Sequence, residues 1–370
     1  MENQFSMCRH LYNWCLQERI EAHGEGSPVY YYAQAMKLPE LKKERPWFKS
    51  VHSQVVQQVL KRLDVSFKNF FRRIKKREAK AGFPKFKKRG QWNSLNYPQY
   101  NKFPSDEIKV PKIGTLKLKL HRALPDGSKV KTLTITKDAG KWFACFSAEV
   151  PYFSDELKQV PNNLLPVGID MGLIDFIYTS NSDKVKVPKH LRKAEAKLKR
   201  LQRRFSKAKK GSKKRLKLLL ALQKIHYRIR CKRLDFLHKT ANSLLKTSNL
   251  VIREDLKVQN MMRRPKPKQD EDGKYLPNNA SAKAGLNKSI ADAGWYTFFT
   301  IVSYKAAHLG KKCISIPPHY TSQKCSECGE IVKKSLSTRT HRCPHCGFTA
   351  NRDHNAALNI LRIGMDSLQS

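Results

Sequence analysis

Acidic residues are scarce in this chain of 370 residues, which carries 30 Asp and Glu against 74 Lys and Arg. The formal net charge of +44 is far above the few charges that solubility requires, and so much charge repels itself unless a polyanion is near. The natural polyanion is nucleic acid. We therefore expect a protein that binds nucleic acid.

Long apolar runs are also lacking. No stretch approaches the roughly 18 apolar residues of a membrane-spanning helix, and the most apolar segment, residues 295–304, predicts a buried helix. The opening Met1-Glu2-Asn3-Gln4 has neither the basic start nor the apolar core of a secretory signal. We expect no membrane partner and a cytoplasmic location.

Nine cysteines fall into two sets. Five are scattered among apolar neighbours and predict small core residues: Cys8, Cys15, Cys145, Cys231 and Cys313. The other four form two C-x-x-C pairs, with 14 residues between the pairs: Cys325, Cys328, Cys343 and Cys346. This spacing predicts a zinc ion held by four thiolates, and such a closed site is structural because no coordination position stays open.

The neighbours of these cysteines are consistent with zinc knuckles. Gly329 and Gly347 directly follow the two pairs, where the turn requires a left-handed residue. His341 and His345 are alternative ligands, but neither has the matching spacing.

Periodicity divides the first part of the chain in two. Residues 1–94 read as helical, since apolar residues recur every three to four positions from Val51 onward. Residues 95–160 alternate between apolar and polar and contain the turn signal Pro125-Asp126-Gly127, which predicts a small antiparallel sheet or barrel. A new strand begins at Val167, so we place a domain boundary at the break Pro161-Asn162-Asn163.

A basic helical hairpin is predicted over residues 187–247, with its turn at Gly211-Ser212. Residues 184–233 contain 22 Lys or Arg and the single acid Glu195. An ordinary solvated helix face mixes both signs, so this one-sided charge favours contact with phosphates. Beyond it, the pattern predicts an apolar strand over 249–256, a helix over 286–308 and a strand over 312–316.

Three acids stand in positions that suggest chemistry. Asp170 lies inside an apolar strand between glycines that allow close approach, Glu254 ends the apolar strand 249–256, and Asp353 opens a helix. A carboxylate within an apolar strand is unfavourable unless it binds a cation or a charged partner. Together the three could chelate two Mg²⁺ ions for phosphodiester hydrolysis. Alternation along the strand leaves Glu254 and Asp255 as alternatives for the second ligand.

Several segments resemble the TnpB family of transposon-associated RNA-guided DNA nucleases, which are related to type V CRISPR effectors. They are GIDMG at 168–172, REDL at 253–256, DAGW at 292–295, TSQKC at 321–325 and NRDHNAA at 351–357, with SQVVQQVLKRL at 53–63 and GFPKFK at 82–87 upstream. The resemblance spans almost the whole chain and assigns the second catalytic acid to Glu254. There are two departures: the family usually has a short strand before the first helix, and Asn351 stands where it often has an acid.

The resemblance implies a multidomain α+β protein. Its parts would be a helical recognition lobe, a small antiparallel β-barrel of wedge type, an RNase H-like (RuvC) α/β nuclease domain, a zinc ribbon and a C-terminal RuvC helix. These correspond to residues 1–94, 95–160, 161–320, 321–349 and 350–370, with the basic hairpin 187–247 inside the nuclease domain.

The resemblance also implies a function. We expect a metal-dependent, RNA-guided DNA endonuclease that binds a guide RNA derived from the transposon end and cuts target DNA next to a short adjacent motif. It would act as a monomer with its RNA, near the nucleoid of a prokaryote. The catalytic residues would be Asp170, Glu254 and Asp353, with two Mg²⁺ ions and one structural Zn²⁺. The alternatives are a guide-directed DNA-binding regulator that does not cut, and a transposase.

Overall fold

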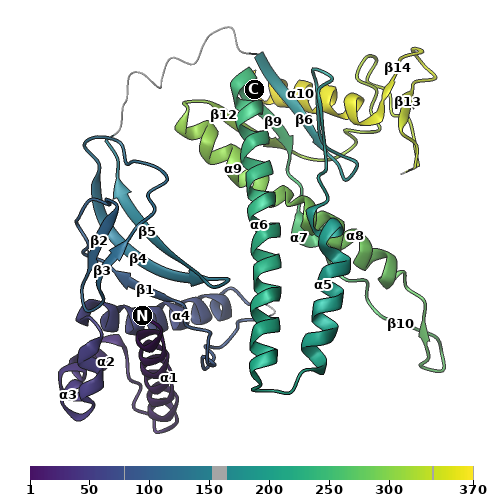
Figure 1. Cartoon of the computed structure of the whole chain (residues 1–370). Coiled ribbons are helices and arrows are strands. Elements are labelled where there is room, and N and C mark those ends of the chain that lie inside the picture. The colour runs from purple at the N-terminus through teal and green to yellow at the C-terminus, as the bar shows by residue number, and fades with distance from the viewer. Residues whose placement is uncertain (79, 152–164, 336, 370) are drawn as a thin grey trace. The chain divides into compact units, whose positions relative to one another are not determined.

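The computed structural model describes residues 1–78, 80–151, 165–335 and 337–369 (Figure 1). The chain forms two compact units, Met1–Tyr152 and Phe153–Ser370. The predicted break Pro161-Asn162-Asn163 and the boundary at residue 160 lie outside the described residues. Within the described residues, no helix has both the length and the apolar character that crossing a bilayer requires.

Helices form the first part of the N-terminal unit, as the periodicity predicts. They are α1 (Glu2–Gly24), α2 (Tyr31–Met36), α3 (Leu38–Glu44), the 3-10 helix η1 (Pro46–Ser50) and α4 (Ser53–Lys75). Helix α4 buries Val55, Val59 and Leu63 at the expected spacing and packs against α1. The predicted helix around residues 8–14 is part of α1.

Two small antiparallel sheets complete this unit. One has the order β1-β4-β5, and the other is the hairpin β2-β3. The strands are β1 (Ser94–Tyr97), β2 (Glu107–Val110), β3 (Gly114–Lys117), β4 (Lys129–Asp138) and β5 (Lys141–Glu149). The helices and the sheet share one apolar core, in which Leu16 and Leu60 lie with Leu95 and Leu133.

The predicted β-barrel is wrong for the described residues. A barrel needs a ladder of hydrogen bonds that continues around all its strands. Here β1 and β5 each pair with β4, while β2 and β3 pair with each other, so the described strands form two separate open sheets.

A five-stranded mixed sheet is the centre of the C-terminal unit. Its order is β12-β9-β6-β7-β8, in which β12, β9 and β6 are parallel and β7 and β8 are antiparallel additions. The strands are β6 (Leu165–Met171), β7 (Asp175–Thr179), β8 (Lys184–Lys186), β9 (Ser248–Glu254) and β12 (Lys312–Ile316). The predicted strands at 167, 249–256 and 312–316 are confirmed, whereas the short β7 and β8 were not predicted.

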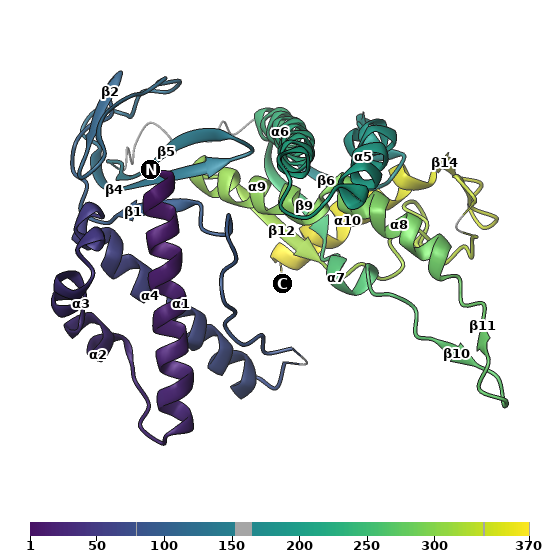
Figure 2. The same cartoon turned by 60° about the horizontal axis from the view of Figure 1, so that its bottom comes forward.

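Helices lie on both faces of this sheet. They are α5 (His190–Lys207), α6 (Lys213–Thr247), α7 (Val258–Met261), α8 (Ala280–Ala293), α9 (Trp295–His308) and α10 (Arg352–Gln369). The predicted basic hairpin is confirmed: α5 and α6 run side by side (Figures 1 and 2). Leu198, Leu222, Ile225 and Ile229 form the apolar seam between them.

The strand residues alternate between α10 on one face and α6 and α9 on the other. Gly168 faces α10 so closely that a Cβ there would lie 2.2 Å from the carbonyl oxygen of Ala357. Ile252 also packs on the α10 side. Because alternate residues of a strand share a face, Asp170 and Glu254 face the α10 side as well.

The single helix predicted over residues 286–308 is two helices. Helix α8 ends at Ala293, and α9 begins at Trp295. Gly294 between them has φ +74°, a left-handed conformation that ends α8, and its N–H donates to the carbonyl of Ile290 at 3.1 Å. The apolar pattern continues through the break, which is why periodicity alone does not reveal it.

Two further hairpins are short. The segment predicted as a loop contains β10 (Lys268–Gln269) and β11 (Tyr275–Leu276), which project away from the sheet (Figures 1 and 2). Strands β13 (Thr340–Arg342) and β14 (Thr349–Asn351) lie in the cysteine-rich segment. Among the scattered cysteines, Cys8 and Cys15 are buried as expected, but Cys145 and Cys231 are exposed, so the core prediction was wrong for those two.

Candidate active site

Two of the three predicted acids are neighbours across the sheet. Asp170 is next to last in β6, and Glu254 is the last residue of β9. The parallel register pairs Ile169 with Arg253, so the next residues along the strands, Asp170 and Glu254, lie side by side. The third acid, Asp353, is the second residue of α10, which packs on β6. The fold therefore brings the three acids to one edge of the sheet.

The electrostatics of Asp170 reflect this gathering of acids. Burial raises the pKa of Asp170 to about 8, and the negative charges of Glu254 and Asp353 raise it further, while Arg352 opposes them. Burial also raises the pKa of Glu254. Carboxylates that resist ionisation in this way are typical of a site that a cation normally compensates.

Glu254 and Asp255 have different surroundings. Glu254 is 9% exposed and accepts a hydrogen bond from the hydroxyl of Thr321, a residue that is itself buried. The side chain of Asp255 is 46% exposed and pairs with Lys257 at 2.5 Å, and this hydrogen bond lowers the pKa of Asp255. Of the two alternatives, only Glu254 therefore lies in the cluster with Asp170.

Asp353 is held by two arginines. Arg352 Nη2 lies 3.1 Å from its Oδ1, and Arg339 Nη1 lies 3.7 Å from its Oδ2. The N–H of Asp353 donates to the side chain of Asn351 at 2.8 Å, so Asn351 acts as the cap of α10. Within the described residues, the three carboxylates are spread more widely than the 4.8 Å that separates the ligand atoms of the cysteine cluster.

The four predicted zinc ligands do come together. The Sγ atoms of Cys325, Cys328, Cys343 and Cys346 all lie within 4.8 Å of one another. Gly329 and Gly347, with φ +83° and +75°, close the two turns by donating to the carbonyls of the first cysteine of each pair at 3.0 and 3.1 Å. The set therefore has the composition and compactness of a tetrathiolate metal site.

The thiol of Cys343 is already inclined to ionise. Burial opposes ionisation, but hydrogen bonds to the backbone N–H groups of Cys346 and His345 lower the pKa of Cys343 to about 6. His341 is buried and pairs with Lys334 through its Nδ1. It is not part of the cluster.

Two asparagines of α10 were not singled out by sequence reasoning. Asn355 and Asn359 are fully buried one turn apart, and both donate to the carbonyl of Lys324, at 2.8 and 2.6 Å. Asn359 also donates to the carbonyl of Thr321 at 2.9 Å. The helix that carries Asp353 thus holds the segment whose Thr321 contacts Glu254 and whose Cys325 begins the metal cluster. The NAALN pattern was the available signal.

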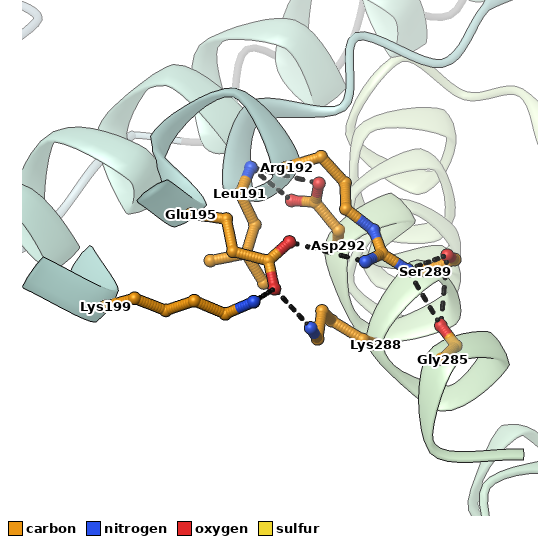
Figure 3. Close-up of polar contacts among 8 residues, drawn as sticks. All are labelled: Leu191, Arg192, Glu195, Lys199, Gly285, Lys288, Ser289 and Asp292. Atoms are coloured by element: carbon orange, nitrogen blue, oxygen red, sulfur yellow. Dashed lines mark hydrogen bonds and ion pairs between the residues drawn. The ribbon is translucent and has the colours of Figure 1, made fainter. Parts of the chain in front are cut away.

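The basic hairpin is anchored by Asp292 of α8 (Figure 3). Both carboxylate oxygens accept the backbone N–H of Leu191, at 3.1 and 3.0 Å, in the first turn of α5. Arg233 of α6 donates to the same carboxylate at 2.8 Å. Because the Asp292 side chain is 3% exposed, this ion pair is well shielded from water. The acid of the DAGW motif therefore has a structural role here.

The only acid of the predicted basic segment makes a second link between α5 and α8 (Figure 3). Glu195 pairs with Lys288 of α8 at 2.5 Å and with Lys199 of α5 at 3.2 Å. Hydrogen bonds with these two lysines lower the pKa of Glu195 to about 2. Glu195 therefore joins the two helices and does not neutralise the outer face of α5.

That outer face is open and positively charged. Arg200, Arg203 and Arg204 are exposed and form no ion pair with any described residue. With Lys199 and Lys207 they line a shallow recess of about 440 Å³. Unpaired arginines along one helix face are suited to bind a row of phosphates.

Two family models match the chain. A model described as "Probable transposase" matches residues 146–264, which include Asp170 and Glu254. A model described as "Cas12f1-like, TNB domain" matches residues 295–360, which include the four clustered cysteines and Asp353.

Individual relatives match over most of their length. "Putative RNA-guided DNA endonuclease InsQ" of Escherichia coli K12 is 35% identical over 363 residues, which cover 96% of this chain and 86% of the relative. "Putative RNA-guided DNA endonuclease" of Streptomyces pristinaespiralis is 31% identical over 376 residues, or 99% and 85% of the two chains. A solved Cas12f1–sgRNA–target DNA complex aligns with 97% of this chain and 93% of its own at 16% identity, but its TM-score of 0.35 is too low to carry an argument. From the motifs and the full-length relatives together, this chain belongs to the TnpB family.

Proposed function

We propose that this chain is an RNA-guided DNA endonuclease that hydrolyses target DNA at Asp170, Glu254 and Asp353. The observation that carries the proposal is the juxtaposition of Asp170 and Glu254 on neighbouring parallel strands, with Asp353 on the helix packed against them. Relatives that match nearly the whole chain bear the name RNA-guided DNA endonuclease, which supports the same activity here.

The three carboxylates fit Mg²⁺, a hard cation that prefers oxygen ligands. The raised pKa values of Asp170 and Glu254 support a cation site, because bound positive charge would stabilise both ionised acids. We infer that the acids hold two Mg²⁺ ions, which supply an activated water and a stabilised leaving oxygen when bound. Asp353 must then exchange its pairing with Arg352 and Arg339 for the metal.

The cysteine cluster fits one structural Zn²⁺. Four thiols within 4.8 Å and a lowered pKa at Cys343 are the features that zinc requires of its ligands. Because all four positions would be taken by sulfur, the ion would stabilise the fold and leave the chemistry to the acids. Metal analysis of the purified protein should find one zinc per chain.

The basic surfaces would hold the nucleic acids. We infer that the exposed arginines of α5 bind phosphates of the guide RNA or of its duplex with the target, and that the protein reads a short motif beside the target. The strand order of the central sheet is consistent with an RNase H-like (RuvC) fold. The assignment of residues 161–320 to that domain, the transposon-end origin of the guide, the monomeric state and the cytoplasmic, nucleoid-associated location stay predictions.

A transposase is the second candidate, because the model that spans Asp170 and Glu254 is described in those words. The same acids could join strands as well as cut them. A strand-joining enzyme would yield covalently linked products from transposon ends, whereas an endonuclease yields free ends at a guided target. A regulator that does not cut would bind the target and leave it intact.

The test is programmed cleavage. The protein is produced together with its native flanking DNA, the copurifying RNA is sequenced, and its variable end is replaced by a chosen guide. A plasmid that carries the matching target should then be cut in Mg²⁺ at the guided position and nowhere else. Cutting that ignores the guide, or joined products, would overturn the proposal.

A further inference from the structure

A recess of about 860 Å³ lies beside the end of β9 and is lined from β9, α7 and α9. Arg253 of β9 belongs to its wall, whereas its neighbour Glu254 faces the α10 side of the sheet. The recess and the acid cluster are therefore one residue apart along the strand but on opposite faces of it. None of the residues that line the recess has a role in the proposed chemistry.

Aromatic side chains dominate the α9 wall of the recess. Tyr296, Phe299 and Tyr304 recur at a spacing that puts them on one side of the helix. Tyr296 is 74% exposed and Tyr304 is 51% exposed, although tyrosine rings are mostly covered in folded proteins. Two open rings in one concave site provide flat surfaces on which another planar group can stack.

Positive charge and polar groups surround these rings. The guanidinium of Arg253 lies 4.2 Å from the centroid of the Phe299 ring, and its Nε is buried without a hydrogen-bond partner among the described residues. Gln259 and Asn260 of α7 and Ser303 of α9 add amide and hydroxyl groups to the wall.

The chain just beyond α7 extends the positive surface. It carries four exposed cations: Arg263, Arg264, Lys266 and Lys268. The single acid of the recess, Asp255, is already paired with Lys257. A ligand that follows this surface should therefore be an anion.

We propose that this recess binds an unpaired nucleotide of the DNA strand that is being cut. Stacking on a tyrosine needs a free base face, which a single strand offers and a duplex covers. The amide and hydroxyl groups can bond the edges of the base, and the flanking cations can hold its phosphates. Since Arg253 and Glu254 are adjacent, a strand that leaves the acids passes the mouth of the recess. This inference rests on the proposed nuclease function.

Binding can be tested without cleavage. The full ribonucleoprotein in EDTA is titrated with a single-stranded oligodeoxynucleotide that contains 2-aminopurine and does not pair with the guide. Tyr296→Ala and Tyr304→Ala should each weaken affinity about 5- to 150-fold, the range that the loss of one stacked base implies. The salt dependence should not change, because the tyrosines carry no charge. Tyr296→Phe and Tyr304→Phe keep the ring and should bind like the wild type.

Tyr275→Ala is the matched control, because Tyr275 is 71% exposed in the same unit but does not line the recess. It should bind like the wild type. If Tyr296→Ala and Tyr304→Ala also bind like this control, the recess is not a nucleotide site. If a single-stranded RNA of the same sequence loses more affinity than the DNA does, the assignment to the DNA strand is wrong. Because this assay needs no cutting, its result is separate from that of programmed cleavage.

Discussion

Replacing Gly168 with alanine should force α10 away from β6. The new Cβ would lie 2.2 Å from the carbonyl oxygen of Ala357 and 2.6 Å from the backbone nitrogen of Leu361. Backbone atoms cannot rotate aside, so the helix itself has to move. Overpacking of this kind destabilises a protein by about 1–3 kcal/mol, and a clash with a helix backbone belongs at the upper end. A loss of about 3 kcal/mol would lower the Tm of the C-terminal unit by about 6–12 °C.

The assay combines thermal unfolding with guided cleavage. Because α10 carries Asp353, its displacement should also reduce cleavage at temperatures where the protein is folded. Gly285→Ala is the matched control: it is the same substitution inside α8, with no atom within 4 Å of the new Cβ. Alanine there should raise stability by about 0.5–1 kcal/mol. Unchanged melting and cleavage in Gly168→Ala would refute the packing of α10 described above.

Three further predictions concern the acids and the hairpin. Thr321→Val removes the donor to Glu254 and should lower Mg²⁺ affinity or cleavage about 10- to 100-fold, with full recovery in Thr321→Ser. Since the metal-free pKa of Asp170 is about 8, Mg²⁺ must displace a proton at lower pH, so the Mg²⁺ needed for half-maximal cleavage should fall about tenfold per pH unit up to about pH 8. Reversing Arg203 and Arg204 should flatten the salt dependence of binding by about 0.9 per lost phosphate contact; an unchanged slope would contradict the phosphate-binding role.

Local patterns in the sequence were sufficient where the structure is local. The two C-x-x-C pairs predicted a cluster because each turn presents two sulfurs by itself, and the apolar spacing predicted the α5–α6 hairpin. The barrel was not predictable in this way, because closure depends on which distant strands pair. The break at Gly294 was hidden because both helices are apolar on either side of it.

The candidate site shows the same division. The glycines around Asp170 indicated close approach, but only the fold identifies the partners: the α10 backbone at Gly168 and the carbonyl of Asp175 at Gly172. Alternation could not separate Glu254 from Asp255, since the choice depends on where β9 ends and on its register with β6. The buried asparagines of α10 have meaning only through the distant loop that they hold.

The most direct test of the central claim is guided cleavage by single acid variants, with target binding measured in parallel. Asp170→Asn, Glu254→Gln and Asp353→Asn should each lose cleavage by about 10³-fold or more, because residues that hold the same metals fail as a unit. All three should still bind guide and target. Asp255→Asn should cut like the wild type, since its side chain points to Lys257 and not to the acids. Inactive Asp255→Asn with active Glu254→Gln, or full cleavage by all three acid variants, would contradict the account.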